Sequence, residues 1–112
     1  MEEIQIPFDV YESTKEIVLV IPLWWVEKKS IKLEFEDYKL ILSWERKSPK
    51  LKEDFQALKQ DVYRGEFKQE IQVPPNIYFD RIQSKLSADN ILTIIIPKAL
   101  IPEKIKLEVS YG

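Results

Sequence analysis

Cysteine and histidine are both absent from this sequence. Without cysteine the chain has no disulfide, no thiolate nucleophile and no sulfur ligand for a metal, which fits a reducing compartment. Without histidine it also lacks the commonest transition-metal ligand and the usual partner of a serine nucleophile. Most familiar catalytic sites are therefore excluded, and we expect this protein not to be an enzyme.

The chain also has no excess of positive charge, few glycines and no long apolar run. Lys and Arg number 17 against 19 Asp and Glu, for a formal net charge of -2, so we expect no nucleic-acid partner. With only 2 glycines there is no Gly-rich phosphate loop, and we expect no cofactor. Residues 1–5 are acidic and polar, unlike a signal peptide, and no apolar run could span a bilayer. We therefore expect a cytoplasmic protein with no membrane partner.

Carboxylates are plentiful, as in residues 34–37 and in the pair Glu53-Asp54. An acid/base pair or a metal site needs carboxylates that converge in a buried place. These carboxylates alternate outward along a strand or lie in a loop, so we interpret them as solvated surface and expect no metal site.

Period-2 alternation of apolar and polar residues is the main structural signal in the chain. It is clearest from Ile31 to Glu36, and the 112 residues suffice for one domain with a single core. Short strands of this kind, punctuated by 7 prolines, predict an all-β fold of the immunoglobulin-like antiparallel β-sandwich type with about eight strands. We expect strands at 8–11, 17–21, 31–36, 38–44, 67–73, 82–86, 91–96 and 105–109.

Residues 48 to 61 are the one ambiguous element. Ser48 could cap a helix, Pro49 suits its first position, and Leu51, Phe55 and Leu58 recur at helical spacing. The same stretch could instead be a charged loop carrying an extra edge strand that exchanges with a second subunit. The pattern alone supports both interpretations.

Three motifs together indicate a family. Gly65-Glu66-Phe67 leads through Ile71-Gln72-Val73-Pro74 to residues 90–98, Asn-Ile-Leu-Thr-Ile-Ile-Ile-Pro-Lys. This series resembles the alpha-crystallin domain of small heat-shock proteins. Segments in the first half stand where that family has corresponding strands: residues 7–12, 17–22 and 40–46. The resemblance implies a short segment 1–6, a sandwich over 7–98 with an insert at 47–61, and a C-terminal extension or closing strand over 99–112.

The sequence departs from the family pattern at a few positions. Asn90 replaces the hairpin glycine, and Asn tolerates the left-handed backbone that this turn needs. Ser84 replaces an alanine, and Gln69 replaces an arginine that takes part in subunit contacts in the family. Trp24-Trp25 occupies a loop where a Pro-Gly turn is expected. Because adjacent side chains of an extended segment point in opposite directions, we expect at least one of these indoles to be exposed. It could be an aromatic contact for a partner, and the alternative is a ring that packs over the open end of the sandwich.

The resemblance also implies interaction sites. Ile105-Lys106-Leu107 corresponds to the family's Ile-x-Ile segment, which docks into a groove on a neighbouring subunit. The alternative is that these residues form an ordinary closing strand on their own domain. The insert would be a dimerisation loop reaching the partner with Leu51, Phe55 and Leu58. We expect the groove to be lined by Leu40, Leu42, Leu92, Ile94 and Ile96, with roughly half of these buried internally.

The implied function is that of an ATP-independent holdase that binds unfolding proteins and suppresses their aggregation. Its partners would be unfolded or partly folded proteins and a second copy of itself, in a homodimer or a larger oligomer. The alternative is a monomeric co-chaperone-type adaptor that binds a folded partner through a sheet face. An insert that reaches a second subunit would favour the holdase, and an insert folded onto its own domain would favour the adaptor.

Overall fold

The alternation of apolar and polar residues produces seven strands in the part of the chain that is described. The structure is a computed structural model and describes residues 6–47, 50–60, 65–99 and 107–111. The strands are β1 (Asp9–Glu12), β2 (Glu16–Pro22), β3 (Lys32–Glu36), β4 (Lys39–Glu45), β5 (Glu66–Gln72), β6 (Gln83–Leu86) and β7 (Ile91–Pro97). Two short 3-10 turns precede β3 and β6: η1 (Lys28–Ser30) and η2 (Phe79–Arg81).

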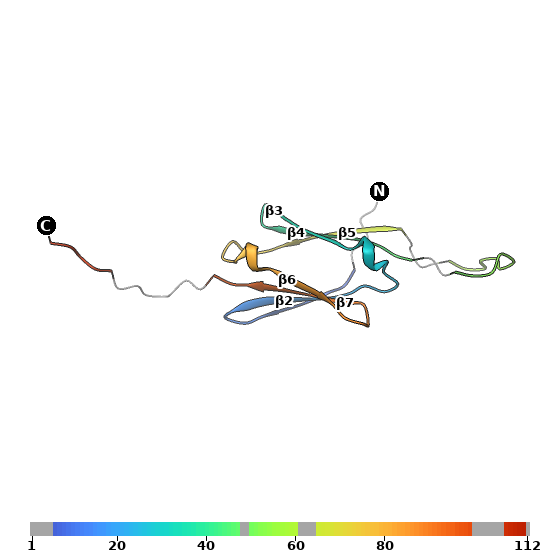
Figure 1. Ribbon diagram of the computed structural model, residues 1–112, viewed down its shortest axis with the longest axis horizontal. Coiled ribbons are helices and arrows are strands. Elements are labelled where there is room, and N and C mark those ends of the chain that lie inside the picture. Colours follow the sequence, from blue (N-terminus) through green and yellow to red (C-terminus); the bar gives the residue numbers. More distant parts are fainter. Residues whose placement is uncertain (1–5, 48–49, 61–64, 100–106, 112) are drawn as a thin grey trace.

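The strands form two antiparallel sheets that lie face to face (Figure 1). One sheet has the order β1-β2-β7-β6 and the other β3-β4-β5. Consequently β1 and β6 are the outer strands of the first sheet, and β3 and β5 are those of the second. The expected all-β, immunoglobulin-like sandwich is confirmed, and the described residues contain no α-helix.

The core lies between the sheets and is built by the central strands. In β2, β4 and β7 every second residue is buried, as the alternation requires. The Trp44 ring stacks on Phe67 of the neighbouring strand, with 5.1 Å between ring centroids. Burying an aliphatic side chain stabilises a fold by about 1.5–3 kcal/mol, so these inner positions stabilise the sandwich most. The most completely buried side chains are Leu19, Ile21, Leu23, Leu40, Leu42, Trp44, Ile94 and Ile96.

Tight turns set the register of the hairpins. The two residues between β3 and β4, Asp37 and Tyr38, have φ values of 49° and 58°, as a two-residue type I′ turn demands. Asn90 before β7 has φ 62°, so the expectation that Asn would serve in place of glycine there is confirmed.

Two expected elements differ from the structure. The part of the insert that is described, residues 50–60, contains neither helix nor strand, while 48, 49 and 61 lie outside the described residues. The strand expected at 105–109 is not formed over 107–109, and residues 105 and 106 lie outside the described residues. Every described residue of both segments is exposed, so the described parts of these segments are not buried against their own domain.

Candidate protein-interaction surfaces

The five residues predicted to line a groove lie in the core instead. Leu40, Leu42, Leu92, Ile94 and Ile96 are each at most 4% exposed. They sit on β4 and β7, which are paired on both sides and covered by the opposite sheet. The expectation that roughly half of the five would be buried is therefore corrected, because all five are buried in the described domain.

Half-buried apolar side chains lie instead on the outer strands β3 and β6. Leu33 and Phe35 pair with buried residues of β4, so they point inward, but their strand has no further neighbour to cover them. Leu86 is the last residue of β6 and Ile82 lies directly before the strand, and both also pack partly against the core. The ring of Phe35 stacks on Phe79 of η2 with 5.6 Å between centroids, which joins β3 to the segment leading into β6. We call Leu33, Phe35, Ile82 and Leu86 the apolar seam.

Strand β1 is exposed on both faces. All four of its residues are exposed, and Val10 and Tyr11 are 56% and 60% accessible although they point to opposite sides of the sheet. Only β2 pairs with β1 among the described residues, so one edge of β1 has no strand beside it. This edge can accept an extended segment.

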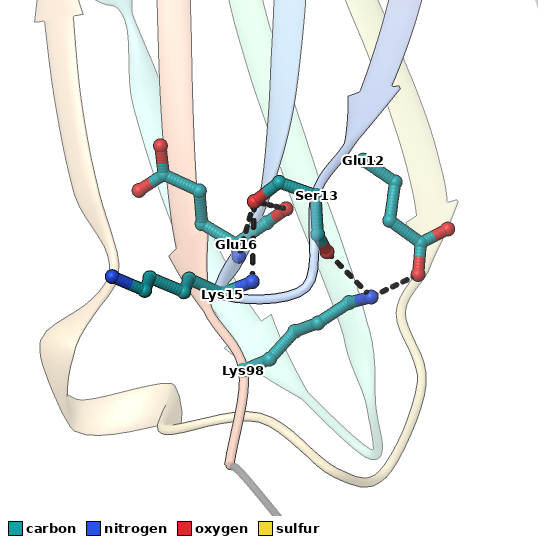
Figure 2. Close-up of polar contacts among 5 residues, drawn as sticks. All are labelled: Glu12, Ser13, Lys15, Glu16 and Lys98. Carbon is teal, nitrogen blue, oxygen red and sulfur yellow. Dashed lines mark hydrogen bonds and ion pairs between the residues drawn. The ribbon is translucent and has the colours of Figure 1, made fainter.

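Lys98 holds the β1–β2 hairpin against the end of β7 (Figure 2). Its ammonium group forms an ion pair with Glu12 at the end of β1 and donates a hydrogen bond of 2.9 Å to the carbonyl of Ser13. Its backbone N–H donates to the carbonyl of Lys15, and the Ser13 hydroxyl accepts hydrogen bonds from the Lys15 and Glu16 N–H groups. The hairpin that carries β1 is therefore fixed to the point where the chain leaves the sandwich.

The insert exposes three large apolar side chains. Leu51, Phe55 and Leu58, the residues expected in a dimerisation loop, are 66%, 63% and 98% exposed. In Figure 1 residues 50–60 project beyond the end of the sandwich, on the side where β5 begins. The structure therefore brings these three residues to a surface that the own domain does not cover.

Both tryptophans of the turn after β2 are exposed. Trp24 is 56% and Trp25 57% exposed, and Trp25 has a left-handed φ of 55°. The Trp25 carbonyl accepts a hydrogen bond of 2.6 Å from the N–H of Lys47, the first residue of the insert. The turn that carries the two tryptophans thus lies beside the base of the insert.

The docking segment expected at 105–107 is described only in part. Leu107 is described and 79% exposed, whereas Ile105 lies outside the described residues. Gln69 points into the sandwich, is 7% exposed and donates from its amide to the Ile6 carbonyl at 3.5 Å. No cluster of three acidic residues suited to a metal ion occurs among the residues that the structure describes. None of the described helical segments has the length and apolarity to cross a bilayer.

Sequence reasoning missed the apolar seam and the bare edge of β1. The alternation in both segments identified their inward-facing residues. Only the strand order shows that β3, β6 and β1 are outer strands, where an inward-facing residue remains accessible. A strand with charged outward residues, such as Lys32–Glu36, was the available hint of an edge position.

Comparisons with known proteins agree with this arrangement. The model of the Hsp20/alpha crystallin family matches residues 9–110. A 17.1 kDa class II heat shock protein of Pisum sativum is 32% identical over 98 residues, which are 87% of this chain and 64% of the relative. A 17.3 kDa class II heat shock protein of Solanum peruvianum is 31% identical over 98 residues, 87% of this chain and 63% of the relative. The chain therefore spans less than two thirds of the length of these relatives.

Solved structures show the same fold. Heat shock protein 16.0 from Schizosaccharomyces pombe superposes with a TM-score of 0.76 at 22% identity, covering 98% of this chain and 100% of the other. A small heat-shock protein from Xylella fastidiosa gives a TM-score of 0.72 at 20% identity, covering 94% and 95%. At these identities the likeness concerns the fold alone.

Proposed function

Since this chain belongs to the Hsp20/alpha crystallin family, we propose that it is an ATP-independent holdase that binds unfolding proteins and suppresses their aggregation. The observation that carries the proposal is the apolar seam between two outer strands. Exposed backbone edges and half-buried aliphatic and aromatic side chains suit an extended apolar segment, which is what an unfolding protein exposes.

Binding at the seam would proceed by strand addition. The segment would pair its backbone with the outer edge of β3 or β6 and place alternate side chains on Leu33, Phe35 and Leu86. Each buried apolar side chain contributes about 1.5–3 kcal/mol at most, so a single contact is weak and several together compete with aggregation. Such binding lowers the concentration of the free non-native chain by mass action and needs no nucleotide.

The C-terminal segment of a neighbouring copy is a second proposed occupant of the same seam. Leu107 is 79% exposed, so it can be offered to another molecule together with Ile105. This occupant would compete with unfolding proteins for the seam.

Self-association is proposed through the insert and β1. The insert offers Leu51, Phe55 and Leu58, and β1 offers one unpaired edge and two exposed faces. Seating the insert of each copy on β1 of the other would cover both and give a homodimer. The monomeric adaptor is the weaker alternative, because it requires an insert folded onto its own domain and residues 50–60 are all exposed.

Light scattering of an aggregation-prone protein, heated or reduced without ATP, tests the holdase proposal. We expect this protein to suppress the scattering at a molar ratio of about one, and Leu33→Ser to weaken the suppression. Ile41→Ser is the matched control, since Ile41 is also half-buried but lies on β4 and faces outward, away from the seam. Absence of suppression by the folded wild-type protein would favour the adaptor.

A further inference from the structure

We propose that the Trp24–Trp25 turn is the receptor for the acidic tip of the insert, Glu53, Asp54 and Phe55, of a second copy of this chain. The inference rests on the proposed self-association and adds to it a specific contact. It concerns neither the seam nor the edge of β1.

The backbone of Trp25 indicates that the indole serves something outside its own domain. A left-handed φ costs a residue with a side chain roughly 1 kcal/mol or more, and glycine avoids this cost. Trp25 nevertheless adopts φ 55° with 57% of its surface exposed. Its carbonyl accepts a hydrogen bond from the Lys47 N–H, which a residue of any type could do. More than half of the Trp25 surface therefore remains available to a partner molecule.

The basic and aromatic residues of the turn complement the acidic and aromatic residues at 53–55 of the insert. Lys28 and Lys29 of η1 follow the turn, are exposed, and form no ion pair with another residue of the described ranges. Glu53 and Asp54 in the insert are likewise exposed and without an ion pair among the residues that the structure places. Phe55 follows them directly and is 63% exposed. Interface anchors typically combine aromatic side chains with nearby charges that are opposite in sign on the two partners.

The positions of the two elements allow a reciprocal contact. The turn and the base of the insert lie at the same end of the sandwich, joined by the Trp25–Lys47 hydrogen bond, and residues 50–60 project away from that end (Figure 1). A two-fold axis beyond this end would place the insert of each copy against the turn of the other, which makes a closed, isologous dimer. Residues 50–60, when extended, reach about 36 Å, enough to cover both the turn and the neighbouring start of β1.

The indoles are tested by measuring the dimer dissociation constant by sedimentation. The double variant Trp24→Ala/Trp25→Gly should weaken the dimer at least about tenfold, as removal of an aromatic anchor does. Trp25→Gly alone should leave the free energy of unfolding unchanged or higher, because glycine suits the left-handed backbone. Tyr111→Ala is the control: Tyr111 is also an exposed aromatic residue, at 95%, and belongs to neither the turn nor the insert, so the dissociation constant should not change.

The charges are tested by reversal and mixing. Glu53→Lys/Asp54→Lys and Lys28→Glu/Lys29→Glu should each dimerise several-fold more weakly than wild type, and an equimolar mixture should form a heterodimer more tightly than either variant alone. In such a heterodimer the reversed charges meet between the two copies, so recovery on mixing assigns the contact to the neighbouring molecule.

Three results would overturn the inference: a monomeric wild type, an unchanged dissociation constant in the tryptophan variant, or no recovery on mixing. Suppression of scattering with full strength in a monomeric variant would leave the holdase proposal intact. The two proposals therefore fail separately.

Discussion

At the scale of single residues, the number of neighbouring strands decides whether an inward-facing side chain is structural or accessible. Leu42 and Leu33 are directly paired across β4 and β3 and point to the same face. Leu42 is completely buried because its strand has a neighbour on each side, whereas Leu33 is half-buried on an outer strand. Two chemically equal residues thus differ in whether an outside segment can reach them.

This pair gives the first prediction. Leu42→Ala should lower the free energy of unfolding by about 2–5 kcal/mol, the cost of a cavity in a closed core, and should affect holdase activity only through the folded fraction. Leu33→Ala should cost about 1 kcal/mol and weaken suppression of scattering in fully folded protein. Urea unfolding followed by tryptophan fluorescence, to which the buried Trp44 contributes the core signal, measures both stabilities. Weak suppression by folded Leu42→Ala protein would restore Leu42 as a binding residue.

At the scale of elements, the sequence predicted the strands well because alternation is a local property. All seven strands of the described region fall where the alternation placed them, and Asn90 turns as expected. The groove could not be predicted correctly, since strand order depends on pairings between distant segments such as β2 with β7. The insert was ambiguous because helical spacing of three apolar residues does not form a helix without a surface to bury them.

The β1–β2 hairpin gives the second prediction, since Lys98 fixes it to β7. Lys98→Met removes the ion pair with Glu12 and the hydrogen bond to Ser13 while keeping most of the aliphatic stem. Because the Glu12 side chain is 62% exposed, the expected loss is only about 1 kcal/mol, with faster amide exchange confined to β1.

Lys15→Met is the matched control for Lys98→Met. Lys15 lies in the same hairpin, but in Figure 2 its side chain points away from Glu12. Its substitution should leave exchange in β1 unchanged. Equal exchange in the two variants would show that Lys98 does not hold the hairpin.

At the scale of the whole molecule, the two ends of the sandwich have different proposed tasks. The end with the tryptophan turn and the insert is the one proposed for self-association, and strand β7 ends at the opposite end (Figure 1). The seam for unfolding proteins lies along the side between them. With a net charge of only -2, repulsion between copies is small, so local charges dominate their approach.

Salt should therefore separate the two functions. Raising ionic strength from about 0.02 M to about 0.5 M shortens the screening length to a few ångströms, which weakens contacts between exposed charges such as Lys28 with Asp54. The dimer dissociation constant should rise several-fold, as measured by sedimentation. Apolar binding at the seam does not depend on such charges, so suppression of scattering per subunit should persist at high salt. A dimer that tightens as salt rises would show that apolar burial alone holds the copies together, and the charged tip of the insert would then have no part in the contact.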